Sequence, residues 1–250
     1  MKRICLLVFI ITMAATGFGQ VQRKTVNQFN AWYMYFGDHK VSDKWGVHLE
    51  AQIRRHGLID EGQQLLLRTG INYHFTNNVF ATVGYGFIET YPYGELPSRA
   101  TFPEHRIWEQ VQVKNQMGVV EFVSRFRLEQ RYSKLPVLVN DVYKPGDAVY
   151  TNRFRLLNRF SVPFKGKTIE DGSFYISVYD EFMINYGKNA GYNIFDQNRA
   201  YLALGYKIPM LGRLEVGYLN QLGFKGNGID VENNHTLQIG LASTLDFYKK

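Results

Sequence analysis

Arginine and glutamate recur at every second position along several segments of this chain. Residues 104–108 place Glu104, Arg106 and Trp108 in this spacing, and residues 125–131 continue it. Because side chains at alternate positions of a β-strand point to the same face, the spacing gathers these groups on one side of a sheet. Guanidinium groups form charge-assisted hydrogen bonds there with carboxylates and with other anions. The residues predicted for this network are Glu104, Arg106, Trp108, Arg125, Arg127, Glu129, Arg131, Arg153, Arg155, Arg159, Glu181 and Arg199.

The opposite face of the same segments carries His105, Glu109 and Ser124, which are residue types that a hydrolase uses. His105 and Glu109 are four residues apart on one strand, about 13 Å at roughly 3.3 Å per residue. A catalytic relay needs contacts of about 3 Å. The spacing therefore disfavours a triad and predicts only a hydrogen bond between Glu109 and Ser124.

Histidine and cysteine usage predicts neither a metal site nor a cofactor. The six histidines are scattered, and only His48 and His74 fall on the polar face of neighbouring segments. A lone inward-facing histidine is more often a member of a hydrogen-bond network than a ligand. No catalytic residue is assigned, and the sequence favours a non-enzymatic protein over an enzyme.

Alternation of apolar and polar residues with a period of two runs through the chain, and no window shows a sustained helical period. The pattern predicts 11 strand candidates. Many have ten residues or more, which exceeds the usual strand length of about 5–6. The candidates are 27–36, 45–54, 65–75, 79–87, 104–116, 120–132, 153–162, 174–186, 199–208, 213–224 and 235–247.

Long alternating strands form either a soluble barrel or sandwich with its apolar face inward, or a membrane barrel with its apolar face outward. Arginine in the middle of the polar faces favours the membrane barrel, since a soluble surface favours Lys, Ser and Thr. Strands of about 9–11 residues also match a tilted bilayer crossing. Aromatic residues near strand ends fit the girdles of such barrels. Among them are Trp32, Tyr33, Tyr35 and Phe36, and Phe247-Tyr248 at the expected end of the last strand.

The connections sort into two alternating sets. The short set comprises 76–78, 116–117 and 209–211, with 165–171 as an intermediate member. The long set comprises 92–101, 133–149, 187–194 and 225–233. Membrane barrels have short periplasmic turns and longer outside loops. If the last strand ends in the periplasm, an odd number of strands makes the first strand begin outside the cell, whereas the N-terminus should begin in the periplasm. The number of strands therefore stays open between 10 and 12.

These patterns predict an all-β fold: an antiparallel, up-and-down transmembrane β-barrel with its apolar face outward and an Arg/Glu-rich lumen. A turn at 116–117 would set the register of residues 104–131. Opposite charges then meet on the diagonals between adjacent strands. The predicted contacts are Arg106 with Glu129, Glu104 with Arg127, and a cation–π contact of Arg125 with Trp108.

The N-terminus resembles a secretory signal peptide. Lys2 and Arg3 precede an apolar stretch at 4–15, and Gly17 and Gly19 supply small residues before a cut near Gly19. The stretch is too short for a transmembrane helix. Residues 1–19 are therefore expected to be removed after Sec-type export, leaving 20–250 as a single barrel domain. The only cysteine, Cys5, would be lost with them.

Composition narrows the class of protein further. Aromatic residues make up 15% of the chain and mean hydropathy is −0.26, which disfavours both disorder and helical membrane spans. The formal net charge is +7, but no Lys/Arg-rich run appears, so nucleic acid is not an expected partner.

Several motifs point to one family. They are EHRIWEQ at 104–110, RFRLEQRY at 125–132, NRFR at 152–155, DEF at 180–182 and FDQNR at 195–199. Together they resemble the domain of unknown function 2490 family of predicted bacterial outer-membrane barrels, from Phe29 to the end of the chain. The resemblance implies a barrel in the outer membrane. It implies no activity, so no catalytic residue is carried over.

Three functions stay open at the level of sequence. The favoured one is an outer-membrane barrel of the Gram-negative envelope without a catalytic site, either a narrow, porin-like, anion-leaning pore or a closed barrel that presents extracellular loops. The second is an outer-membrane lipid-modifying enzyme of the acyl hydrolase type with a site at the rim. The third is a soluble periplasmic barrel that binds a small ligand. Expected partners are outer-membrane lipid, a small anionic solute and the barrel-assembly machinery.

Overall fold

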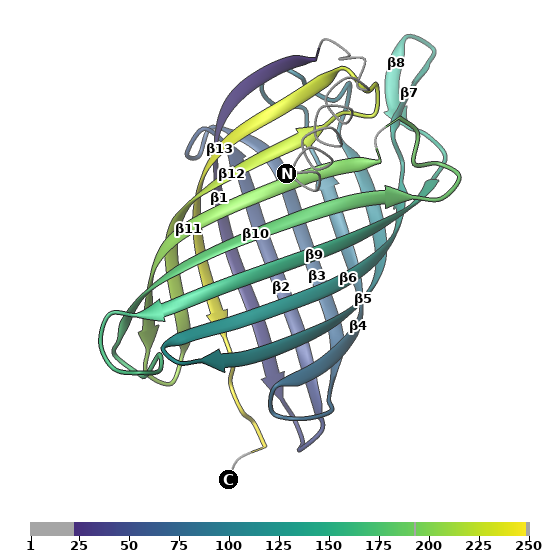
Figure 1. The fold of residues 1–250 in the computed structure, drawn as a ribbon. Helices are drawn as coiled ribbons and strands as arrows, with labels where there is room; N and C mark the ends of the chain where they lie inside the picture. The colour runs from purple at the N-terminus through teal and green to yellow at the C-terminus, as the bar shows by residue number, and fades with distance from the viewer. Residues whose placement is uncertain (1–22, 193, 249–250) are drawn as a thin grey trace, which may run out of the picture.

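The computed structural model describes residues 23–192 and 194–248 (Figure 1). Within these residues, eleven long strands close into one barrel, and a short hairpin stands apart from it. The predicted signal peptide, with Cys5, lies outside the described residues. The barrel strands are β1 (Lys24–Lys40), β2 (Trp45–His56), β3 (Glu61–His74), β4 (Val79–Thr90), β5 (Phe102–Met117), β6 (Val120–Ser133), β9 (Val149–Pro163), β10 (Phe174–Tyr186), β11 (Phe195–Ile208), β12 (Gly212–Phe224) and β13 (Asp230–Ser243).

Neighbouring barrel strands are antiparallel everywhere except at the closure, where β1 pairs with β13 in parallel. The parallel register runs from Lys24 beside Asp230 to Gly37 beside Ser243. In an up-and-down barrel with an odd number of strands, the first and last strands point the same way, so their pairing must be parallel. The eleven strands lie within the predicted range of 10 to 12, and residues 27–36 form part of a regular strand.

The two faces of the barrel wall have opposite character, as the period-two pattern predicts. In β2, His48, Glu50 and Arg54 are buried, whereas Leu49 and Ile53 are 43% and 50% exposed on the outside. A strand turns alternate side chains to opposite faces, so one apolar wall faces out and one polar wall faces the lumen. Within residues 23–192 and 194–248, no helix is long and apolar enough to cross a membrane.

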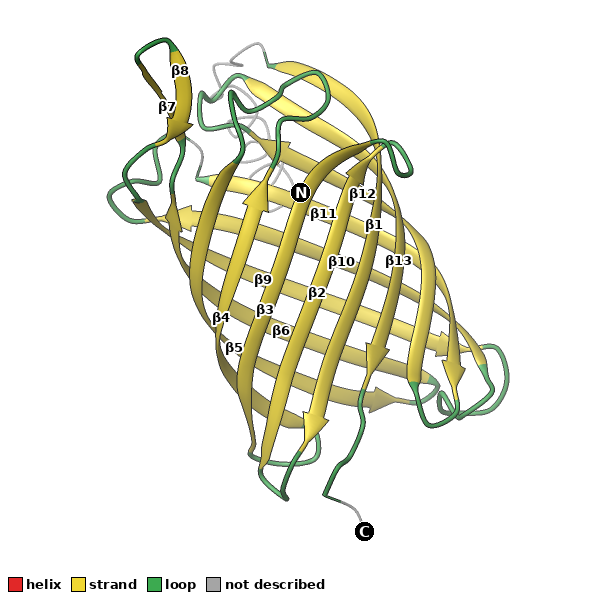
Figure 2. Ribbon diagram, turned by 180° about the vertical axis from the view of Figure 1, so that it is seen from behind, coloured by secondary structure: helices red, strands yellow, loops and turns green. Residues whose placement is uncertain are grey.

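The connections divide between the two ends of the barrel (Figure 2). At the short-turn end lie residues 41–44, 75–78, 118–119, 164–173 and 209–211. At the long-loop end lie residues 57–60, 91–101, 134–148, 187–192 with 194, and 225–229. The loop between β6 and β9 contains the hairpin of β7 (Pro136–Val139) and β8 (Val142–Pro145), which projects beyond the rim. Strand β1 begins at the long-loop end, and β13 ends at the short-turn end.

Most strands extend beyond at least one of their predicted bounds, and two predicted features at strand ends were wrong. The β5–β6 turn lies at Gly118-Val119 and not at 116–117. Gly118 has a φ of +61°, a conformation that glycine adopts without steric cost. Strand β13 ends at Ser243, so Phe247 lies beyond it, where its backbone N–H donates to the Lys40 carbonyl over 2.9 Å.

Candidate functional site in the barrel lumen

All twelve residues predicted for the charge network lie on inward faces of β5, β6, β9, β10 and β11. Nine of them are buried, while Arg125, Arg131 and Arg159 are partly exposed within the lumen. The prediction of which side chains share a face therefore agrees with the structure. What the structure adds is which charge contacts which.

The register of β5 and β6 differs from the predicted one by four residues. Trp108 lies opposite Glu129, and Arg106 lies opposite Arg131. A shift by an even number of residues leaves every side chain on its original face. The predicted contact of Arg106 with Glu129 is present, with 3.6 Å between their charged atoms.

The other two predicted contacts in this hairpin were wrong. Glu104 pairs with Arg131 over 2.7 Å and with Arg106, instead of with Arg127. The guanidinium over the Trp108 ring belongs to Arg127, whose Cζ lies 4.6 Å from the ring centroid. Both differences follow from the shifted register. Glu104 now lies opposite Ser133 and diagonal to Arg131, and Trp108 lies opposite Glu129 and diagonal to Arg127.

Glu129 is the centre of the network. It is fully buried and contacts four arginines: Arg153 at 2.6 Å, Arg155 at 2.8 Å, Arg68 at 3.3 Å and Arg106 at 3.6 Å. A carboxylate has two oxygens with about four acceptor sites, so four guanidinium groups use its capacity. A buried carboxylate without such partners carries a large desolvation cost.

Glu181 forms a second centre. Its carboxylate contacts Arg125 at 2.7 Å, Arg155 at 2.8 Å and Arg199 at 3.5 Å. Arg155 joins the two centres, because Nη1 donates to Glu129 and Nη2 donates to Glu181. The network is thus continuous from β5 to β11.

Several members of the network were absent from the predicted set. Arg68 of β3 pairs with Glu50 of β2 at 3.0 Å, and His48 contacts Asp38 at 2.8 Å. Their alternation along β2 and β3 was visible in the sequence. Their proximity to Glu129 was not, because β3 and β6 are separated by two strands in the barrel order.

Two aromatic residues assigned to the outer girdle face the lumen instead. Trp32 is 1% exposed, and its ring lies 3.9 Å from the Arg54 guanidinium and 5.0 Å from that of Arg199. Phe36 also points inward. An arginine over an aromatic face gains a cation–π attraction, which explains why a large ring sits among charges. Tyr175, Tyr179 and Tyr201 also lie on inward faces.

A cavity of about 80 Å³ remains inside the lumen. Seven arginines and two glutamates contribute to its lining, together with Trp32, Tyr179 and uncharged residues. The charged residues are Arg54, Arg68, Arg125, Arg127, Arg155, Arg159, Arg199, Glu50 and Glu181.

Residues 29–233 match the sequence profile of a family described as a protein of unknown function, DUF2490. The chain belongs to the DUF2490 family. No curated protein and no solved structure matched it. The family match covers every barrel strand that contributes to the charge network.

The hydrolase-type residues of this DUF2490 barrel have separate partners. His105 bonds the Tyr85 hydroxyl over 2.5 Å, Glu109 accepts from Gln130 at 3.2 Å, and Ser124 bonds Asn158 at 2.9 Å. The predicted hydrogen bond between Glu109 and Ser124 is therefore wrong. Among the described residues, no group of three or more His, Cys, Asp or Glu side chains is arranged to hold a metal ion.

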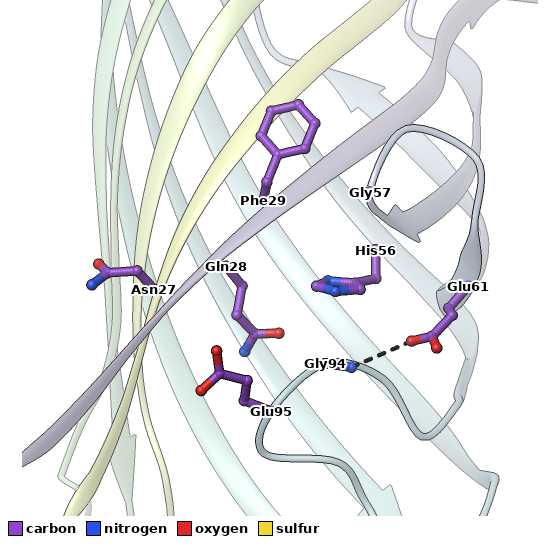
Figure 3. Close-up of a pocket in the computed structure, with 8 residues that line it drawn as sticks. All are labelled: Asn27, Gln28, Phe29, His56, Gly57, Glu61, Gly94 and Glu95. Carbon is purple, nitrogen blue, oxygen red and sulfur yellow. Dashed lines mark hydrogen bonds between the residues drawn. The ribbon is translucent and has the colours of Figure 1, made fainter.

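A second, larger cavity of about 510 Å³ lies at the long-loop end (Figure 3). Gln28, His56, Glu61 and Glu95 point toward one another there, and the Gly94 backbone N–H donates to Glu61 at 3.5 Å. This mouth cavity is acidic, in contrast to the arginine-rich cavity deeper in the lumen.

Loop residues also close over the mouth. The Tyr93 hydroxyl donates to Glu232 of β13 over 3.1 Å. Burial raises the pKa of the Tyr93 phenol, and the nearby Glu232 carboxylate raises it further. This contact ties the β4–β5 loop to the strand at the closure.

Proposed function

We propose that the protein is an outer-membrane β-barrel that is closed by ion pairs across its lumen and presents its long loops outside the cell. The observation that carries this proposal is the distribution of polarity across the wall. Ile71 and Val83 are each 60% exposed on the outside, while arginines and glutamates fill the inside. Soluble monomers rarely expose apolar patches larger than about 300–600 Å². In a membrane, the apolar side chains of the whole outer wall contact lipid and are not exposed to water.

Closure follows from ion pairs that cross the lumen. Arg68 of β3 reaches Glu129 of β6, although two strands separate them. Arg213 of β12 pairs with Glu121 of β6 at 2.5 Å, with three strands between them in the barrel order. Contacts of this kind place side chains across the path of a solute and leave a cavity of about 80 Å³ in the lumen.

Location is tested by fractionating cells that express the full chain. We expect the protein in detergent-resistant envelope membranes and a heat-dependent shift in its migration on a denaturing gel, as folded barrels resist unfolding. Recovery in the soluble periplasmic fraction would overturn the proposal and establish the soluble barrel instead.

Closure is tested by reconstituting the protein into planar bilayers. We expect no steady single-channel current. A steady anion-selective current from the wild type would show that the barrel is a pore, and would overturn the proposal of a closed barrel. Release of fatty acid from lipopolysaccharide or phospholipid by the purified protein would replace it with the lipid-modifying enzyme.

A further inference from the structure

Two arginines of the lumen differ from the rest in their partners. Arg54 donates to Gln52 and Gln64, and Arg127 donates to Gln110. Among residues 23–192 and 194–248, neither has a carboxylate within ion-pair distance. Arg54 is 7% exposed and Arg127 is 2% exposed, so both side chains are largely removed from bulk water. Each carries a buried positive charge that only neutral amides and an aromatic ring contact.

Both arginines line the lumen cavity. Its lining counts seven arginines against two glutamates, a formal excess of five positive charges. Buried charges of one sign repel each other strongly, because the protein interior screens them less than water does. This excess already subtracts the two glutamates. Two carboxylates outside the lining also pair with lining arginines, Glu129 with Arg68 and Arg155, and Glu215 with Arg159. Within residues 23–192 and 194–248, Arg54 and Arg127 are the lining arginines whose charge no carboxylate pairs.

Unpartnered donor atoms around the cavity are a second indication of an anion site. The Nε atoms of Arg68, Arg125 and Arg199 are buried and have no hydrogen-bond partner within the part of the chain that the structure describes. Buried guanidinium N–H groups are normally satisfied, and each exception needs an explanation. An oxyanion within the cavity would supply both the missing charge and acceptors for such donors.

The size of the cavity selects the ligand class. About 80 Å³ is room for several water molecules, since one molecule needs ~10–15 Å³ of such volume. That space suits a tetrahedral inorganic oxyanion and excludes a nucleotide or a sugar phosphate. Tyr179 adds a hydroxyl to the lining, and its ring lies 5.2 Å from the Arg159 guanidinium.

We infer that the lumen cavity is a binding site for a small oxyanion with the size and charge of inorganic phosphate, held chiefly by Arg54 and Arg127. The anion neutralises part of the arginine excess and so stabilises the folded barrel. This inference rests on the lumen geometry and does not depend on the membrane location or on closure of the barrel.

Isothermal titration of inorganic phosphate into the full chain, refolded in a non-ionic detergent, tests the site directly. We expect one saturable site per chain, competed by sulfate. Chloride at matched ionic strength should produce no saturable binding. Absence of a saturable phosphate site in the wild type would overturn the inference, whatever any variant does.

Variants assign the site to its residues. Arg127→Gln and Arg54→Gln should each weaken phosphate binding at least tenfold, because each removes a charge that lacks a carboxylate partner. Arg131→Gln is the matched control, since Arg131 faces the lumen and pairs with Glu104 but does not line the cavity. It should bind phosphate within twofold of the wild type.

Equal loss in Arg131→Gln would mean that lumen charge in general governs binding, and would overturn the assignment to Arg54 and Arg127. If Arg127→Gln does not refold, Arg127→Lys keeps the charge and removes the planar donor group. Phosphate binding by Arg127→Lys weaker than that of the wild type would support the site, and unchanged binding would overturn the role of Arg127 as a directional donor.

Discussion

The interior of the barrel has two walls of different chemistry. The charged wall comprises the inward faces of β2, β3, β5, β6, β9, β10, β11 and β12, with the uncharged inward face of β4 between β3 and β5, and it carries the ion pairs around Glu129 and Glu181. The seam wall comprises the inward faces of β1 and β13. It holds uncharged polar side chains such as Gln28, Asn30 and Asn234, all buried.

The two walls also differ in how well their acceptor atoms are satisfied, although the Nε atoms of Arg68, Arg125 and Arg199 in the charged wall have no partner among the described residues. The carboxylate of Glu129 contacts four guanidinium groups. In the seam wall, both amide atoms of Gln28 and the hydroxyl of Thr236 have no hydrogen-bond partner among the described residues. Parallel pairing at the β1–β13 closure is, in addition, slightly less stable per residue than antiparallel pairing. The comparison teaches that ion pairs between side chains add to the backbone ladder in the charged wall, whereas the seam has the backbone ladder with few such pairs.

Removing the centre of the charged wall should have the largest effect. Glu129→Gln leaves four buried arginines without their shared carboxylate, and breaking a buried pair costs ~3–5 kcal/mol. We expect a loss of that size in the free energy of unfolding, measured by denaturant titration of the refolded protein in detergent. A Glu129→Gln variant as stable as the wild type would remove the distinction between the walls.

Alanine substitutions at two inward-facing glycines test how tightly each of the two walls is packed. A Cβ on Gly84 of β4 would lie 2.6 Å from the Trp108 ring, whereas a Cβ on Gly240 of β13 would meet nothing nearer than 3.9 Å. Overpacking costs ~1–3 kcal/mol, so Gly84→Ala should destabilise the barrel by that amount. Gly240→Ala should be neutral or slightly stabilising in the same denaturant titration. Equal losses in the two variants would show that both walls are packed alike.

The loop contact above the seam should have a smaller effect. Tyr93→Phe removes one hydrogen bond to Glu232, which is worth ~0.5–1.5 kcal/mol. Limited proteolysis should then cut residues 91–101 faster than in the wild type. Tyr143→Phe, in the β7–β8 hairpin, is the matched control and should leave the cleavage rate unchanged.

The same contact predicts a pH dependence. The raised pKa of Tyr93 means that the folded state favours the neutral phenol. Its stabilisation is therefore fully present below the ordinary tyrosine pKa of about 10 and is lost progressively as the pH rises above it. Tyr93→Phe should remove this part of the alkaline loss of stability. An identical alkaline profile in the two proteins would contradict it.

The smallest effect is expected within the seam wall. Thr236 is fully buried, and its hydroxyl has no partner among the described residues. Thr236→Val replaces that hydroxyl with a methyl group of similar size, so we expect a change within about 0.5 kcal/mol or a slight gain in stability. A loss above about 1 kcal/mol would show that the hydroxyl is satisfied and that the seam is as well bonded as the charged wall.

Local alternation made much of the fold predictable. The period-two pattern alone placed Arg127, Glu129 and Arg153 on inward faces. The error of four residues in the predicted register did not change the face on which each side chain lies. Pairing across the hairpin was less predictable, because it depended on whether the turn began at residue 116 or at Gly118.

Contacts across the lumen could not be predicted from the sequences of individual strands. Nothing in the spacing of Arg68 and Glu129, which are 61 residues apart, indicates that they meet. Their approach depends on the number of strands and on how far each is staggered against its neighbours when the sheet closes. The inward position of Trp32 was missed for a related reason, since aromatic residues near strand ends suit either face.

The sequence by itself determined that the chain forms long strands with one charged and one apolar face, because side-chain direction in a strand depends only on position along it. Within residues 23–192 and 194–248, only the tertiary structure decided that eleven strands close through a parallel seam, that Glu129 contacts four arginines, and that Arg54 and Arg127 have no carboxylate partner. Those outcomes depend on closing the whole sheet on itself, which brings distant strands to opposite sides of one narrow lumen.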